Sequence, residues 1–188
     1  MESEKLHNPF IIGDRVYLRP LERSDINERY LYWLNDPEVN RYLETGVFPQ
    51  TLESLERFYE NQISSHTDIV LAIIDKEKDV HIGNIKLGPI NWIKRRSYLG
   101  MLVGDKNYWG KGLGTEIRRL MVEYAFYRLN LHRIDSSMYA EHKAIIRVNE
   151  KLGFKVEGIV RECVVIDGKY SNGVIMGLLR SEYKRENE

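Results

Sequence analysis

The sequence predicts a single domain of mixed α/β structure, on three observations. Its 188 residues, 22.2 kDa in mass, match the size of one ordinary domain. Hydrophobic residues make up 43% and charged residues 30%, a composition that excludes a disordered chain. Segments of alternating polarity and segments of helical periodicity follow one another along the chain, without a regular βαβ repeat. We expect the domain to span residues 1–188, with flexible tails at about 1–12 and 183–188.

The first part of the chain predicts one strand and three helices. Arg15–Arg19 alternates in polarity and indicates the strand. Asp25 stands three residues before Glu28, as in a capping box, and predicts that the first helix begins at Asp25. The segment Glu38–Leu43 indicates a second, short helix, and Thr51 precedes a third segment of helical spacing.

The remainder predicts a sheet crossed by two helices and closed by a hairpin. The expected strands lie at 69–75, 81–90, 97–103 and 133–139. One expected helix follows Gly114, with Glu116 and Arg118 mostly off its apolar face, and another spans 143–152. Strands at 156–166 and 174–179 flank the turn Asp167-Gly168.

The charge balance and the single cysteine narrow the classes of function. Lys plus Arg and Asp plus Glu both number 28, so no electrostatic argument favours a nucleic-acid or membrane-surface partner. Cys163 alone excludes an intrachain disulfide and indicates a reducing, cytoplasmic setting, and we expect it to serve packing. The five histidines are scattered, so we expect no metal site. The start carries no apolar run, and the longest apolar stretches are too short to span a bilayer.

The most informative segment is Tyr108-Trp-Gly-Lys-Gly-Leu-Gly-Thr115, between a strand and a helix. Alternate glycines permit positive φ, and their N–H groups at a helix start suit a phosphate or pyrophosphate. The competing interpretation is a tight strand-to-helix turn without a ligand. The spacing fits neither the P-loop nor the Rossmann pattern, which weakens a nucleotide-binding interpretation.

This loop resembles the pyrophosphate loop of the GNAT acetyltransferases, which bind acetyl-CoA. Its Tyr-Trp-Gly-Lys-Gly form is similar to the branch of ribosomal-protein N-terminal acetyltransferases and their amino-sugar and polyamine relatives. A second segment, Ile146-Arg-Val-Asn-Glu-Lys-Leu-Gly-Phe154, resembles another motif of that branch. Shorter matches include Trp33-Leu-Asn-Asp-Pro37, and the resemblance extends over about Arg15–Tyr183.

The resemblance implies an α/β (α+β-like) domain with a central mixed, mostly antiparallel and splayed sheet flanked by helices. It implies an N-acetyltransferase that moves an acetyl group directly from acetyl-CoA, its acyl-donor substrate, to a primary amine, without a metal. The residues it assigns to the cofactor are Met101, Leu102, Val103, Trp109, Gly110, Lys111, Gly112, Leu113, Gly114, Thr115, His142 and Asn149.

The catalytic positions depart from the family pattern. Asn149 stands where many members carry a tyrosine that protonates the thiolate, and Tyr98 lies near the usual glutamate position. Asn cannot act as an ordinary general acid, although its amide can donate to sulfur. Tyr98, Ser137 and Asn149 are therefore the catalytic candidates, with Glu162 as a more distant acid, and structural hydrogen bonds as the alternative.

The acceptor side is less defined. Trp33, Asp36 and Glu44 lie in the early helical region that borders the acceptor in the family, and we take them as substrate-binding candidates. A protein N-terminus, an amino sugar and a polyamine all remain open as acceptors. A second interpretation is an acyl-CoA-binding regulatory protein without turnover. A homodimer is a possible assembly.

Overall fold

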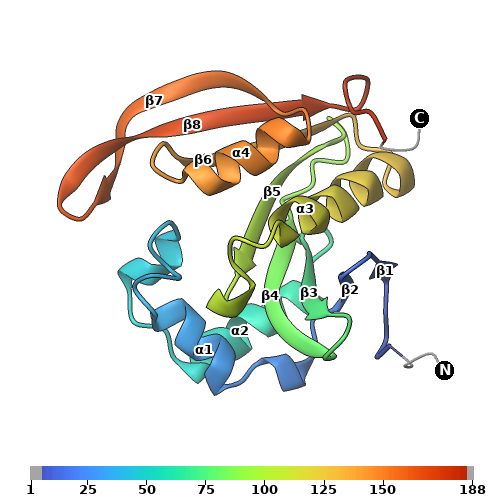
Figure 1. Cartoon of the computed structure of the whole chain (residues 1–188), viewed down its shortest axis with the longest axis vertical. Helices are drawn as coiled ribbons and strands as arrows, with labels where there is room; N and C mark the ends of the chain where they lie inside the picture. The colour runs from blue at the N-terminus through green and yellow to red at the C-terminus, as the bar shows by residue number, and fades with distance from the viewer. Residues whose placement is uncertain (1–5, 186–188) are drawn as a thin grey trace.

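A computed structural model describes residues 6–185 and shows one twisted sheet with helices on both faces (Figure 1). The sheet order is β1-β2-β3-β4-β5-β6-β8-β7. The strands are β1 (Ile11–Ile12), β2 (Val16–Pro20), β3 (Ile69–Asp75), β4 (Val80–Leu87), β5 (Arg96–Val103), β6 (Arg133–Tyr139), β7 (Lys155–Ile166) and β8 (Lys169–Leu179). The helices are α1 (Glu28–Asn35), α2 (Leu52–Ile63), α3 (Leu113–Glu123) and α4 (Lys143–Lys151), and a π-helical turn, Tyr124–Arg128, continues α3.

The sheet is mixed and mostly antiparallel, as expected. Among the strands of residues 6–185, only β5 and β6 pair in parallel, and their pairing covers just Arg96–Tyr98 against Arg133–Asp135. Beyond these residues the two strands separate, while β4 stays paired to β5 and β8 to β6. The sheet is therefore open along its middle, which confirms the splayed architecture.

The two faces of the sheet bury different sets of side chains. The larger core lies under α3 and includes Ile117, Met121 and Phe126. On the other face, α1 and α2 cover smaller clusters around Tyr17 and Trp33. Burial of these apolar surfaces supplies the main driving force for the fold.

Helix α3 buries more polar groups than its periodicity indicates, which corrects the expected placement of Glu116 and Arg118. Both are buried. Glu116 accepts hydrogen bonds from the backbone N–H groups of Arg15, at 2.8 Å, and Val16, at 3.3 Å. These bonds lower the pKa of Glu116 against the opposing effect of its burial. Glu116 is thus covered by the chain segment that leads into β2, whereas Arg118 is covered by Leu99 of β5 and Ser136 of β6.

Two predictions about the first helical region are wrong. Helix α1 is capped by Asn27, whose side chain accepts from the N–H groups of Arg29 and Tyr30, and Asp25 lies in a preceding 3₁₀ turn. The segment Glu38–Leu43 forms turns, followed by the 3₁₀ turn Glu44–Val47. The Asn40 side chain donates to the Leu34 carbonyl at 2.8 Å, a local bond that competes with a helix.

The ends of the described chain and Cys163 also differ from expectation. Ile11–Ile12 pairs with β2, and Tyr183 is buried beside Phe126, so these parts of the expected tails are held in the fold. Residues 1–5 and 186–188 lie outside the described residues. Cys163 is exposed rather than packed, because β7 carries it onto the outer hairpin.

Candidate active site

The gap between β5 and β6 exposes one edge of β5. The Tyr98 carbonyl accepts from the Gly88 N–H at 2.9 Å, so the backbone groups of Tyr98 face away from the gap. Because edges alternate along a strand, the backbone groups of Leu99, Met101 and Val103 face the gap. The Val103 carbonyl accepts from the Trp109 indole at 2.8 Å. Met101, between Leu99 and Val103, can therefore pair with an extended ligand that adds to the strand.

The glycine loop lies at the far end of β5 and opens into α3. Gly110 and Gly112 have φ of 71° and 77°, and Gly112 is the N-cap of α3. A Cβ at Gly110 would meet nothing within 4 Å among the described atoms, so the surface of the loop is open. Backbone N–H groups in such a loop, at the positive end of a helix dipole, form an anion site.

Gly114 differs from the other two glycines of the loop. It lies in the first turn of α3, where a Cβ would approach Met101 Cε at 3.4 Å and Val148 Cγ2 at 3.6 Å. These are ordinary van der Waals distances, so the packing of α3 on β5 and α4 does not require a glycine at this position. Lys111 is exposed, and its carbonyl accepts from the Arg15 guanidinium at 2.8 Å. That bond holds the loop against the segment before β2.

Three polar side chains meet under the narrow end of the gap. Arg118 Nη2 donates to Ser136 Oγ at 3.0 Å, and Asn149 Nδ2 donates to the same oxygen at 3.2 Å. Arg118 is 1% exposed and Asn149 is 0% exposed. Burial lowers the pKa of Arg118 to about 9, so the guanidinium keeps its charge at neutral pH. Sequence reasoning missed Arg118 and Ser136, because a polar residue on a helix or strand carries no signal of burial.

The opposite face of the splayed strands carries Tyr98 and Ser137. Tyr98 is 44% exposed, with the Arg96 guanidinium over its ring at 5.9 Å, and Ser137 is exposed one residue beyond Ser136. Gly100, two residues after Tyr98, leaves open space beside it. These positions form an accessible surface beside the gap. Glu162 is also exposed, on the bulged part of β7.

His142 lies at the start of α4 and stacks on Tyr42, with ring centroids 4.2 Å apart. Burial lowers the pKa of His142, and the nearby Arg118 charge acts in the same direction. Tyr42 also contacts Tyr139 edge to face at 6.1 Å. The loop after α1 therefore reaches across to the open side of β6.

The three acceptor candidates have different surroundings. Trp33 is buried, lies directly against Gly104, and contacts His81 edge to face at 5.2 Å. Asp36 is buried and pairs with Lys106 Nζ at 2.8 Å. Glu44 is exposed. Of the three, only Glu44 offers an accessible carboxylate.

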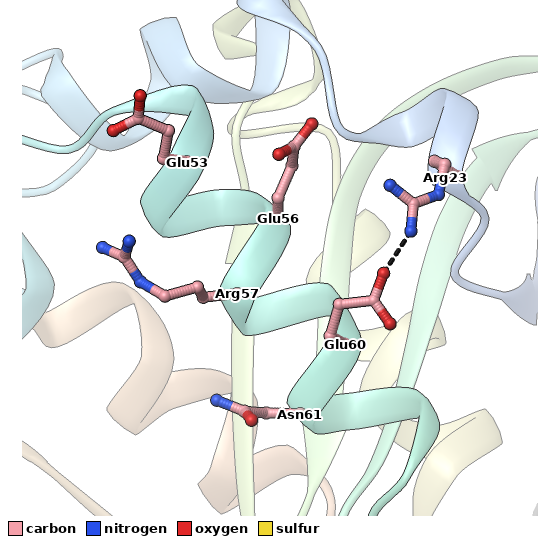
Figure 2. A pocket seen from close by; sticks show the side chains of 6 residues that line it. All are labelled: Arg23, Glu53, Glu56, Arg57, Glu60 and Asn61. Atoms are coloured by element: carbon pink, nitrogen blue, oxygen red, sulfur yellow. Dashed lines mark hydrogen bonds and ion pairs between the residues drawn. The ribbon is translucent and has the colours of Figure 1, made fainter.

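Another hollow lies over the outer surface of α2 and is separate from the gap. Figure 2 shows its lining, the charged Arg23, Glu53, Glu56, Arg57 and Glu60 together with the neutral Asn61. Arg23 and Glu60 form an exposed ion pair there. Exposed pairs of this kind contribute little to stability.

The family model of the acetyltransferase (GNAT) domain matches residues 15–155 of this chain. The chain belongs to the GNAT acetyltransferase family. It is an acetyl-CoA-dependent N-acetyltransferase, as the sequence predicted, and the regulatory alternative has no support.

Three relatives illustrate the match. Spermidine N(1)-acetyltransferase of Escherichia coli K12 is 32% identical, over 92% of this chain and 90% of its own. An uncharacterized N-acetyltransferase, p20, of Bacillus licheniformis is 29% identical over 90% and 96%. The crystal structure of spermidine N-acetyltransferase from Vibrio cholerae with CoA and spermine superposes with a TM-score of 0.82 and 26% identity, covering 90% of this chain and 98% of that one.

Two features are absent from the part of the chain that the structure describes. Residues 6–185 contain no group of three or more His, Cys, Asp or Glu side chains arranged to hold a metal ion. Over the same range, no helix has the length and apolar character needed to cross a bilayer.

Proposed function

We propose that this enzyme acetylates a small primary amine, and that the amine is of the polyamine class. The observation that carries the proposal is the similarity, over about nine-tenths of the chain, to enzymes named for spermidine, one of them solved with CoA and spermine. In this chain, the exposed carboxylates of Glu44 and Glu162 provide charge complementary to a polycation.

The acyl donor is assigned to the gap between β5 and β6. Its extended pantetheine arm would pair with β5 around Met101, and the loop from Trp109 to Thr115 would hold the pyrophosphate. His142 borders the same gap from α4. Asn149 is fully buried, and its amide is linked to the edge of the gap through Ser136.

Acetyl transfer requires the ammonium to lose a proton, the nitrogen to attack the thioester carbon, and the thiolate to leave. Positioning both reactants in one gap supplies a large share of the rate enhancement, of order 7–11 kcal/mol in favourable systems. Tyr98 and Ser137, exposed beside the gap, are the groups proposed to carry the amine's proton to solvent.

The acceptor class is tested by incubating the enzyme with acetyl-CoA and equal concentrations of polyamines, amino-sugar nucleotides and short peptides. Mass spectrometry of the products should show acetylated polyamine in excess. Preferential acetylation of peptide N-termini or amino sugars would contradict the polyamine proposal without affecting the assignment of the CoA site.

The CoA assignment is tested by Gly112→Val with Gly168→Val as its matched control. Both glycines have positive φ, 77° and 75°, but Gly168 lies at the tip of the β7–β8 hairpin. A ligand at a hundredfold excess over its Kd stabilises a protein by about 2.7 kcal/mol, which appears as a rise in Tm. We expect Gly112→Val to lose that rise and Gly168→Val to keep it. An equal rise in both variants would show that the loop does not bind CoA.

We propose further that the enzyme forms an oligomer. Val156, Ile159, Val160, Val165 and Tyr170 are exposed on the β7–β8 hairpin. A related V. cholerae spermidine N-acetyltransferase, 27% identical with a TM-score of 0.77, has been solved as a dodecamer. Light scattering after size-exclusion chromatography gives the assembly directly, and a monomer at all concentrations would contradict the proposal.

A further inference from the structure

The narrow end of the β5–β6 gap contains a buried cation without an anionic partner. The Arg118 guanidinium is 1% exposed, and among residues 6–185 no carboxylate forms an ion pair with it. Its polar contacts are the Ser136 hydroxyl at 3.0 Å and the Leu99 carbonyl at 3.4 Å, and its Nε has no hydrogen-bond partner within the described chain. Buried charges are ordinarily paired, because an unpaired one is costly. The face of the Phe154 ring, 5.8 Å from Arg118 Cζ, offsets part of this charge, and within residues 6–185 no anion offsets the rest.

The Ser136 hydroxyl carries the effect of this charge toward the gap. A serine hydroxyl has two acceptor positions and one proton. Here Arg118 Nη2 and Asn149 Nδ2 both donate to the oxygen, at 3.0 and 3.2 Å. The hydroxyl proton is donated to the Leu99 carbonyl, whose oxygen lies 3.5 Å from Ser136 Oγ, the outer limit of a hydrogen bond. The Ser136 proton is thus polarised by the neighbouring Arg118 cation, and the hydrogen bond that it donates is weak.

These groups lie at the point where the two strands separate. Tyr98 and Asp135 form the last pair of the parallel ladder, so Leu99 and Ser136 are the first residues on either side of the gap. If the acyl donor adds to β5 as an extended chain, its reactive end lies beside these two residues. This step rests on the proposed location of CoA.

We propose that Arg118 is a positioning residue for acyl transfer, whose charge acts through the Ser136 hydroxyl to stabilise the leaving thiolate. In the step concerned, the neutral amine nitrogen forms a bond to the thioester carbon and the C–S bond breaks. The electron pair of the broken bond leaves on the CoA sulfur, and the proton of the new ammonium nitrogen passes to solvent. Stabilising charge in place lets the thiolate leave without a phenolic acid.

The test uses bound CoA alone, so it does not depend on the acceptor. The thiol of CoA is titrated by the ultraviolet absorbance of its thiolate, free and bound to saturating wild-type enzyme, Arg118→Met or the remote surface variant Arg57→Met. We expect bound CoA to ionise at lower pH than free CoA in the wild type and in Arg57→Met. In Arg118→Met the midpoint should rise by about one pH unit, a tenfold change in the ionisation ratio.

Kinetics give a second readout. For Arg118→Met we expect kcat to fall about 100-fold, with the KM for acetyl-CoA changed by less than about threefold, because the charge acts on the transition state. Arg118→Lys keeps the charge and should recover part of kcat.

Ser136→Ala provides an independent test of the relay, and it decides the case if Arg118→Met does not fold. It should raise the thiol midpoint in the same direction. The proposal is overturned if a folded, CoA-binding Arg118→Met or Ser136→Ala titrates the thiol as the wild type does. A wild type that does not bind CoA would instead contradict the proposed location of the donor.

Discussion

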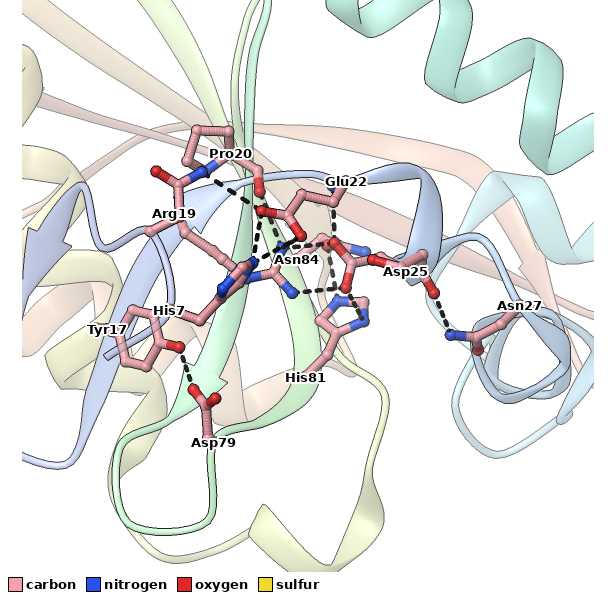
Figure 3. A network of polar contacts seen from close by, with 12 residues as sticks. His7, Tyr17, Arg19, Pro20, Glu22, Asp25, Asn27, Asp79, His81 and Asn84 are labelled. Atoms are coloured by element: carbon pink, nitrogen blue, oxygen red, sulfur yellow. Dashed lines mark hydrogen bonds and ion pairs between the residues drawn. The ribbon is translucent and has the colours of Figure 1, made fainter. Parts of the chain in front are cut away.

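Two buried arginines in this enzyme have opposite surroundings. Arg19 forms two hydrogen bonds to Asp25, at 2.7 and 2.8 Å, within a network that includes His81 and Asn84 (Figure 3). Arg118 contacts only neutral groups. The first network joins β2, the turn before α1 and β4, and it meets the splayed part of β5 only on the side away from the gap, where Asn84 of β4 pairs with Leu102. The second lies where the sheet opens.

The difference separates two uses of a buried charge. When a buried charge is fully paired, removing one partner leaves the other charge buried and uncompensated, which is destabilising. Such a pair therefore holds together the elements that carry it. When a cation is unpaired, the protein bears its desolvation cost, and the charge is available to a ligand that brings an anion. The comparison predicts that the two arginines will respond differently to mutation.

Asp25→Ala gives the largest expected effect on stability. It removes both short hydrogen bonds of the buried Arg19 and leaves it the Pro20 carbonyl at 3.0 Å and the more distant Glu22 carboxylate at 3.9 Å, and it removes the acceptor of the Glu22 N–H. We expect the free energy of unfolding to fall by about 3–5 kcal/mol, measured by urea denaturation. Glu60→Ala, which breaks the exposed pair with Arg23, is the control and should cost less than about 1 kcal/mol. Equal losses of unfolding free energy in the two variants would contradict the distinction between the buried Arg19–Asp25 pair and the exposed Arg23–Glu60 pair.

Arg118→Met should behave in the opposite way. The methionine fills much of the same space, and its burial carries no charge penalty. Replacing a whole buried ion pair by apolar residues is often neutral or stabilising by about 1–4 kcal/mol, because the desolvation cost is removed. Arg118 has no charged partner to leave behind, so we expect a Tm equal to or above that of the wild type. A loss of more than about 2 kcal/mol would indicate that Arg118 serves mainly to join Leu99 and Ser136.

The smallest effect is the response of the paired network to pH. Burial lowers the pKa of His81, and the nearby Asp25 carboxylate offsets only part of this effect. The unfolded chain therefore binds a proton near pH 6.5 that folded His81 does not, and stability falls as the pH drops below about 6.5. The slope for one such group is at most about 1.4 kcal/mol per pH unit.

This dependence is measured by urea unfolding at pH 7.5 and 5.5. His81→Gln should reduce the difference, leaving a part due to His142, whose pKa is also lowered. Asp25 adds a separate loss at lower pH: burial alone would raise its pKa, but the bond from Arg19 holds it below the ordinary value. A wild type that gains stability between pH 7.5 and 5.5 would contradict this account of His81.

The sequence by itself determined the features that depend on neighbouring residues. The alternate glycines permitted positive φ, which Gly110 and Gly112 have and Gly114, already in the first turn of α3, does not, and the periodicity after Gly114 predicted α3. The strands expected at 69–75 and 133–139 coincide with β3 and β6, and Asp167-Gly168 predicted the hairpin turn. Together with the family motifs, these signals were sufficient for the fold class and the transferase chemistry.

Only the tertiary structure decided which polar side chains are buried. The sequence predicted that Asp25 caps a helix. In the structure Asp25 instead pairs with the buried Arg19 of β2, and Asn27 caps the helix. The sequence predicted that Arg118 lies on the exposed side of its helix. Its burial follows from the parting of β5 and β6, strands that meet only through long-range pairing. Local patterns record polarity along one element, whereas the surroundings of a charge depend on elements that are distant in sequence.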